Sequence, residues 1–217
     1  MLLCIEGSDG SGKSSVADAL AKRLKGDVLS FPNDSGMTGP LIRQYLRKQW
    51  WLSGSTDIFD EAADCRHAEA MAFQALQVTN RLGVMPRLMD AALGHAKTPI
   101  VLARYWQSGW VYGQLDGLDP NWLTDIHKTM ARPNLNILLD LDPDEAMRRR
   151  AARDGPLSAE RYEGKRELAV KIAELYRQLW QKQTIGWAVV DANQPFDAVC
   201  TACWKLLSSD PWCTSRG

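Results

Sequence analysis

The sequence carries no excess charge of either sign. It contains 26 Lys and Arg residues and 26 Asp and Glu residues among 217, so its formal net charge is zero. A protein without net positive charge lacks the overall field that attracts nucleic acid. Nucleic acid is therefore not expected as a partner unless the fold gathers basic residues into a local patch.

Long apolar runs are also missing. No segment approaches the roughly 20 apolar residues that a membrane-spanning helix needs. The chain enters a predicted strand at Leu2, where a secretory signal would have a basic segment followed by a hydrophobic stretch. We therefore expect no membrane partner and a soluble protein of the cytoplasm.

Cysteine is sparse, and its number is odd. The five cysteines cannot all pair with one another, and Cys4 lies inside a predicted strand, so a disulfide framework is not expected. Cys200 and Cys203 have the spacing of a metal-binding pair, but no second pair or nearby histidine completes a zinc set. These two cysteines are better explained as positions on a helix.

The sequence has no internal repeat, no low-complexity segment and no convincing linker. A chain of 217 residues suits one domain around a single core. We assign residues 1–207 to that domain and expect the polar residues 208–217 to form a mobile tail.

The most informative stretch is Gly7–Ser14, which reads GSDGSGKS and fits the pattern GxxxxGK[ST]. It follows a short apolar run and precedes a helical pattern in which Val16, Leu20 and Leu24 recur every four residues. A strand, a glycine loop and a helix in this order are typical of a phosphate-binding loop. The sequence therefore predicts that this stretch binds the phosphates of a nucleotide.

The residue types in the loop suit that chemistry. Glycine lets backbone N–H groups approach the phosphates, and the following helix adds the positive end of its dipole. Lys13 adds a positive charge and Ser14 can ligate Mg²⁺, so ATP and Mg²⁺ are the expected cofactors. The expected cofactor-binding residues are Gly7, Ser8, Asp9, Gly10, Ser11, Gly12, Lys13, Ser14 and Ser15, with Ser14 as the metal ligand.

Strands and helices alternate along the rest of the chain. Apolar runs predict four further strands at 28–31, 99–103, 136–141 and 187–190. Helices are expected at about 40–51, 59–96 with a break at 83–86, 104–114 after an initial turn, 121–130, 143–153, 158–183 and 195–207. This alternation indicates an α/β fold, a three-layer sandwich in which a five-stranded parallel sheet has helices on both faces.

Besides the loop, several local strings are informative, namely Phe31 and Pro32, Thr79-Asn80-Arg81, Arg104, Tyr105, Ser108 and Tyr112, and Arg161-Tyr162-Glu163. Together with the loop, these strings resemble the thymidylate kinase family, whose members transfer the γ-phosphate of ATP to dTMP. The resemblance covers most of the chain. It implies the P-loop NTPase fold with a short arginine-bearing lid at about 148–160, and it leaves a homodimer open.

The resemblance also implies roles. Arg104 would hold the acceptor phosphate, the lid arginines would close over the transferring group, Asp9 would reach the acceptor sugar, and Arg81 would bind the base. The implied catalytic residues are Lys13, Arg104, Arg149, Arg150 and Arg153. The implied substrate-binding residues are Asp9, Phe31, Pro32, Asp34, Phe73, Gln77, Arg81, Arg104, Tyr105, Ser108, Tyr112 and Tyr162.

Four positions depart from the family pattern. Asp34 stands where the family has an arginine for the acceptor phosphate, and Gln77 replaces an aromatic that stacks on thymine, although Phe73 lies one turn earlier. Ala103 replaces an aspartate expected near Mg²⁺, and Gly113 replaces a glutamine. Losing the stacking aromatic and the phosphate arginine would weaken dTMP binding by roughly 1–3 kcal/mol apiece.

These departures leave the acceptor open. We expect a nucleoside monophosphate kinase with a small-molecule nucleotide acceptor, which is dTMP, dUMP or a 5-substituted dUMP, for dNTP synthesis. One alternative is a P-loop kinase that acts on a modified base hydroxyl or on DNA. The other is a nucleotide-dependent binding or regulatory module with little transfer activity, an option that Ala103 keeps open.

Overall fold

The computed structural model describes residues 1–47, 63–154, 162, 165–182 and 186–209. Its strands form one parallel sheet in the order β2-β3-β1-β4-β5. They are β1 (Leu2–Gly7), β2 (Asp27–Ser30), β3 (Ile100–Ala103), β4 (Leu135–Asp140) and β5 (Trp187–Asp191). The predicted five-stranded parallel sheet is therefore confirmed.

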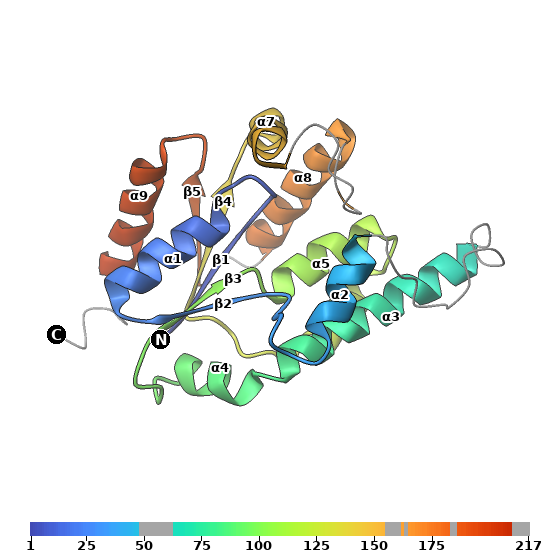
Figure 1. Cartoon of the computed structure of the whole chain (residues 1–217), viewed down its shortest axis with the longest axis horizontal. Coiled ribbons are helices and arrows are strands. Elements are labelled where there is room, and N and C mark those ends of the chain that lie inside the picture. The colour runs from blue at the N-terminus through green and yellow to red at the C-terminus, as the bar shows by residue number, and fades with distance from the viewer. Residues whose placement is uncertain (48–62, 155–161, 163–164, 183–185, 210–217) are drawn as a thin grey trace.

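Helices cover both faces of the sheet (Figure 1). Side chains alternate between the faces of β1, so Leu3 and Ile5 pack with α1 (Lys13–Leu24) and α9 (Phe196–Ser209). Leu2 and Cys4 face the opposite core, which includes residues of α4 (Met85–Ala92), α5 (Trp106–Leu115) and α8 (Arg166–Lys182). Both faces of the central strand are buried, which explains its continuous apolar run.

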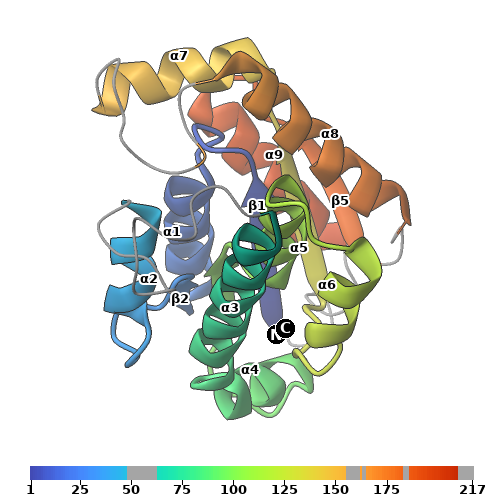
Figure 2. The ribbon, with the colours of Figure 1, turned by 90° about the vertical axis from the view of Figure 1, so that its right-hand side faces the viewer.

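The remaining helices pack against neighbouring helices (Figure 2). They are α2 (Gly39–Leu46), α3 (Ala63–Leu82), α6 (Pro120–Ile126) and α7 (Pro143–Asp154). The side chain of Asp119 starts α6 by accepting hydrogen bonds from the backbone N–H groups of Asn121 and Trp122, at 2.7 and 2.9 Å. α3 and α6 pack on α5, α2 packs on α3, and α7 packs on α8.

Four predicted helix boundaries are wrong. The helices expected to end at residues 51 and 96 end at Leu46 and Ala92, with Arg47 and Leu93 as their C-caps. The helix expected at 121–130 ends at Ile126, because residues 127–130 form tight turns in which Lys128 N donates to Asp125 O and Met130 N donates to His127 O. The helix expected from residue 158 begins at Arg166, since Tyr162 lies in a turn and Lys165 is not helical. Parts of these and other predictions, at 48–62, 155–161, 183–185 and 210–217, lie outside the described residues.

The C-terminal helix extends beyond its predicted end. α9 continues to Ser209, two residues into the expected tail, and it includes Cys200 and the buried Cys203. Across the described ranges, none of the helices is both long and apolar enough to cross a membrane.

Candidate active site

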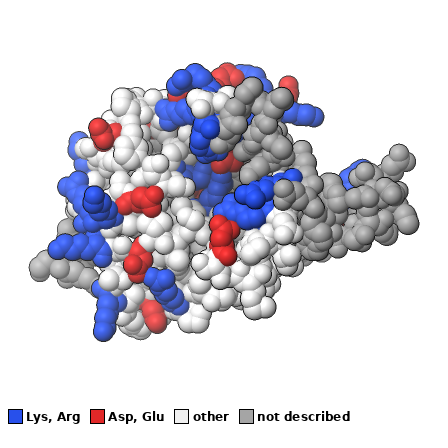
Figure 3. All heavy atoms as spheres, viewed as in Figure 1, with Lys and Arg blue, Asp and Glu red and all other residues white. Residues whose placement is uncertain are grey.

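A cleft of about 500 Å³ opens where β1, β2 and β3 end. Basic side chains surround a hollow in the face shown in Figure 3. Six of the residues that line the cleft are basic and one is acidic, namely Lys13, Arg43, Arg81, Arg104, Arg149 and Arg153 against Asp9. The other lining residues are Gly10, Gly12, Ser14, Ser15, Ser30, Phe31, Pro32, Leu46, Gln77, Ala103, Ser108, Tyr112 and Tyr162. The neutral chain therefore gathers a strong local positive charge that suits a phosphorylated ligand.

The glycine loop connects β1 to α1 and lies at the base of this cleft. Gly7 has a φ of +146°, and a Cβ there would lie 2.6 Å from the carbonyl oxygen of Leu139. Gly10 has a φ of +86°, and its Cβ would lie 2.7 Å from the carbonyl oxygen of Ala146. Side chains are excluded from these two positions by both conformation and space. The hydroxyls of Ser8 and Ser11 are buried without hydrogen-bond partners among the described residues.

Lys13 and Asp9 meet inside the loop. The Lys13 ammonium donates to the carbonyl oxygen of Ser8 at 2.6 Å and lies 3.7 Å from a carboxylate oxygen of Asp9. Burial, followed by the charge of Arg104, lowers the pKa of Lys13 to about 7. Burial raises the pKa of Asp9, but the charges of Arg104, Lys13 and Arg153 outweigh it and hold the pKa well below its usual range.

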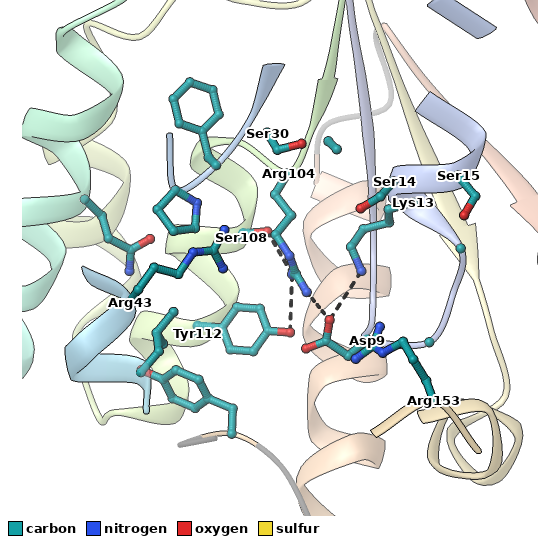
Figure 4. Close-up of a pocket in the computed structure, with 18 of the residues that line it drawn as sticks. Asp9, Lys13, Ser14, Ser15, Ser30, Arg43, Arg104, Ser108, Tyr112 and Arg153 are labelled. Carbon is teal, nitrogen blue, oxygen red and sulfur yellow. Dashed lines mark hydrogen bonds and ion pairs between the residues drawn. The ribbon is translucent and has the colours of Figure 1, made fainter. Parts of the chain in front are cut away.

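Arg104 follows β3 and forms an ion pair with Asp9 (Figure 4). It adopts a left-handed conformation with a φ of +67°, which is uncommon for a residue other than glycine. Its Nη1 lies 3.5 Å from the hydroxyls of both Ser108 and Tyr112. Burial lowers the pKa of Arg104, but the Asp9 carboxylate and other nearby groups outweigh burial and raise the pKa above its usual value. The guanidinium therefore stays charged.

Glu6, which sequence reasoning missed, holds this segment in place. Its buried carboxylate accepts hydrogen bonds from the backbone N–H of Tyr105 at 2.7 Å and of Ser108 at 3.2 Å. It also accepts from the hydroxyls of Ser108 and Tyr176, each at 2.9 Å. The signal in the sequence is an acidic residue at the end of an otherwise apolar strand.

Arg81 lines the cleft although its side chain is almost fully buried. It donates to the carbonyl oxygen of Tyr105 at 3.0 Å and to Oε1 of Gln77 at 3.1 Å. Burial lowers the pKa of Arg81 to about 10, so the side chain remains positive near neutral pH. Tyr105, predicted as a substrate-binding residue, is not among the described lining residues, because its ring is buried against Phe31.

Two further predicted acceptor residues, Phe73 and Asp34, are also absent from the described lining of the cleft. Phe73 is buried and stacks on Tyr45 with ring centroids 4.1 Å apart, so it does not replace the missing stacking aromatic. Asp34 is exposed outside the lining of the cleft and pairs with Arg43 of α2. Arg43, not predicted as a site residue, is the member of this pair that lines the cleft. Phe31, Pro32 and Gln77 line it as expected.

Two tyrosines form one wall of the cleft. The rings of Tyr112 and Tyr162 lie with their centroids 4.9 Å apart. The Tyr162 hydroxyl donates to the carboxylate of Asp116 at 2.5 Å, which ties the turn at 162 to the end of α5. Ser108 completes the predicted set on this side.

The predicted lid arginines lie on α7, and two of them line the cleft. Arg153 reaches toward Asp9 in Figure 4, whereas the guanidinium of Arg149 binds Glu145 at 2.6 Å and the carbonyl oxygen of Ala192 at 3.0 Å. Arg150 is not among the lining residues. The remainder of the predicted lid, residues 155–160, lies outside the part that the structure describes.

A glycine loop at the carboxyl edge of a parallel sheet, facing a second group of cations, defines a P-loop phosphotransferase. Comparisons with known proteins identify the family. The sequence model of the thymidylate kinase family matches residues 5–202. The chain therefore belongs to the thymidylate kinase family. It is therefore an ATP-dependent nucleoside monophosphate kinase of the thymidylate kinase type.

Individual relatives agree with this assignment. A probable thymidylate kinase of Pyrobaculum calidifontis is 30% identical over 196 residues, which span 90% of this chain and 89% of the relative. The structure of thymidylate kinase from Candida albicans has a TM-score of 0.74 and 26% identity, and the match covers 96% of this chain and 91% of that one. The structure of a deoxyadenosine kinase from M. mycoides has a TM-score of 0.68 and 16% identity, and the match covers 97% of this chain and 100% of that one. At this low identity the likeness shows only the fold.

Proposed function

We propose that this kinase transfers the γ-phosphate of ATP to a pyrimidine deoxynucleoside monophosphate of the dTMP type, which is dTMP, dUMP or a 5-substituted dUMP. One observation carries the proposal: a single cleft is lined by Lys13 of the phosphate-binding loop, by Arg104 and by the buried Arg81. These three cations suit a donor phosphate, an acceptor phosphate and an acceptor base in turn. The family assignment supports the same division of the cleft.

Neutralisation of charge is the main chemical task in this reaction, because donor and acceptor phosphates repel each other. Lys13 would contact the donor phosphates and Arg104 the acceptor phosphate. Arg153 and Arg149 enter the cleft from α7 and would add positive charge beside the transferring group. Asp9, which keeps a negative charge between Lys13 and Arg104, would orient both cations.

Arg43 offers a second cation for the acceptor phosphate. The family arginine expected at position 34 is absent, but the guanidinium of Arg43 lies in the lining of the cleft and is held by Asp34. The Asp34 carboxylate is therefore not an unpaired anion beside the acceptor, because it forms a bidentate ion pair with Arg43. We propose that this pair replaces the missing arginine.

The acceptor base and sugar would bind near α3 and α5. Arg81 keeps its charge and offers donors to base oxygens, and Gln77 lies beside it in the lining. The ring of Tyr112 would press against the sugar, favouring deoxyribose. The relative from Candida albicans is described as having broad substrate specificity, which supports an assay with several acceptors.

The residues present fit Mg²⁺. Ser14 lines the cleft in the first turn of α1, and its hydroxyl is the kind of oxygen ligand that Mg²⁺ accepts. Within the described ranges, no group of three His, Cys, Asp or Glu side chains could hold a metal ion. Mg²⁺ commonly binds through few protein ligands together with nucleotide phosphates, so we propose that Ser14 binds it with ATP. The bound ion would neutralise phosphate charge.

Three further expectations stay predictions. They are the cytoplasmic location, the homodimer and the closure of a lid at about 148–160.

A coupled assay for ADP formation tests the proposal, with dTMP, dUMP, 5-hydroxymethyl-dUMP, dCMP, dGMP and a single-stranded oligonucleotide as acceptors. We expect Mg²⁺-dependent transfer to one or more of the dTMP-type acceptors, and loss of that transfer in Lys13→Ala. Transfer to the oligonucleotide alone would favour a kinase that acts on nucleic acid. ATP binding without transfer to any acceptor would contradict the proposal and favour a binding module.

A further inference from the structure

His127, a buried histidine that was not predicted as a site residue, contacts the guanidinium of Arg81. Nε2 of His127 lies 3.3 Å from Nη1 of Arg81, and Nδ1 of His127 lies 2.7 Å from the carbonyl oxygen of Leu123. A carbonyl oxygen only accepts hydrogen bonds, so Nδ1 carries the imidazole proton. Nε2 is then the acceptor for a hydrogen bond that Arg81 donates.

Two glycines of α5 make room for this contact. A Cβ on Gly109 would lie 2.8 Å from Nε2 of His127, and a Cβ on Gly113 would lie 2.5 Å from Cδ2 of Leu123. α6 therefore packs closely on α5 (Figure 2). Gly113 stands where the family pattern has glutamine, and its missing side chain leaves room for Leu123 of α6.

The guanidinium of Arg81 is fixed from three directions by neutral acceptors. They are Nε2 of His127 after α6, Oε1 of Gln77 on α3 and the carbonyl oxygen of Tyr105 before α5. Burial and the charge of Arg81 lower the pKa of His127 to about 3, so the imidazole stays neutral at physiological pH.

Arg81 keeps donors that these contacts do not use. Its Nε is buried with no hydrogen-bond partner among the described residues, and the side chain lines the cleft. A buried donor without a partner is costly, so Arg81 has hydrogen-bonding capacity that its contacts with the described residues leave unused. The three neutral contacts therefore fix the direction of Arg81 while leaving it charge and donors for the base.

We infer that His127 is a positioning residue for acceptor recognition, which holds Arg81 in the orientation that binds a base with keto oxygens. This inference rests on the proposed function, because it requires Arg81 to contact the acceptor. His127 itself contacts no substrate in this arrangement, and its effect passes through Arg81.

Steady-state kinetics of His127→Leu and His127→Gln test the inference. Loss of one hydrogen bond to a charged group predicts that His127→Leu raises the KM of the best dTMP-type acceptor about tenfold or more, with the KM of ATP unchanged. His127→Gln retains an oxygen acceptor and should recover most of this loss. His95→Leu, a change of an exposed histidine, is the matched control. An acceptor KM in His127→Leu within twofold of the wild type would overturn the inference.

A second measurement does not depend on variants. Nitrogen NMR of the imidazole in the wild-type protein should show Nδ1 protonated and Nε2 unprotonated between pH 5 and pH 8. A proton on Nε2 would overturn the inference even if the enzyme is active, since Arg81 could not then donate to it. Failure of the proposed function would look different: the wild type would phosphorylate no dTMP-type acceptor, whatever the tautomer.

Discussion

The carboxylate of Asp34 accepts two hydrogen bonds from the guanidinium of Arg43, at 2.8 Å from Nε and 3.1 Å from Nη2. Both side chains are partly exposed, so the pair adds little to stability. The pair matters because it fixes the orientation of the Arg43 side chain, and Arg43 lines the cleft whereas Asp34 does not. An acidic residue that would repel an acceptor phosphate on its own here orients a cation toward the cleft.

Replacing Arg43 with Ala should therefore raise the KM of the acceptor about 10- to 100-fold, as expected for loss of a charge-assisted contact. The KM of ATP should change little. Asp34→Asn should have a smaller effect in the same direction, because Arg43 keeps its charge but loses its fixed orientation. Arg47→Ala, one turn further on and exposed, is the control. Equal effects of the changes at 43 and 47 would show that Arg43 has no special role.

ATP binding should take up a proton at pH 8. The pKa of Lys13 is about 7, so this lysine is mostly neutral at pH 8. Nearby phosphates stabilise the ammonium form and raise its pKa. Affinity for ATP should accordingly weaken as the pH rises above 7, by at most about tenfold per pH unit.

Calorimetry of ATP binding in buffers with different heats of ionisation measures this uptake. At pH 8 the wild type should take up close to one proton more than Lys13→Ala, and at pH 6 the difference should nearly vanish. The same uptake in both proteins at pH 8 would assign the proton to another group.

Glu6→Gln should destabilise the fold and slow phosphoryl transfer. The amide cannot accept all four hydrogen bonds that the carboxylate accepts from Tyr105, Ser108 and Tyr176, and bonds to a charged group contribute about 1.5–3 kcal/mol each. We expect a loss of about 3 kcal/mol in the free energy of unfolding, measured with urea. Tyr176→Phe removes a single donor and should cost less. A loss in Glu6→Gln no greater than in Tyr176→Phe would contradict this account.

Ala103→Asp should strengthen Mg²⁺ binding by the ATP complex. Ala103 ends β3, lines the cleft and pairs in register with Ser30 of β2. A carboxylate at this position would add a ligand or an acceptor for metal-bound water, with a gain in affinity of about tenfold. Ala103→Asn is the control of similar size. If a Mg²⁺ titration gives the same affinity for both variants, the aspartate of the family pattern has no counterpart function in this chain.

Sequence reasoning predicted the features that neighbouring residues in the sequence determine. β1, β3 and β5 start within one residue of prediction because short apolar runs between turn residues determine them. The glycine loop was predictable because its spacing and flanking elements are specific to phosphate binding. Lys13, Arg81, Arg104 and Tyr112 all line the cleft as expected.

The features that were missed depend on how distant helices pack. Phe73 turns toward Tyr45 because α2 lies against α3, and no pattern within α3 specifies that neighbour. Arg43 lines the cleft, and it pairs with Asp34 across nine positions of sequence. Contacts of Glu6 with Tyr176 and of Arg81 with His127 join residues 170 and 46 positions apart. Period and spacing contain no information on such pairs.

Gly10 also allows α7 to lie close to the glycine loop. Its missing Cβ would lie 2.7 Å from the carbonyl oxygen and 3.3 Å from the Cα of Ala146, which is on the helix that bears Arg149 and Arg153. An arginine in the loop at this position would collide with the backbone of that helix. The close approach of α7, which brings Arg149 and Arg153 to the cleft, therefore depends on glycine at position 10.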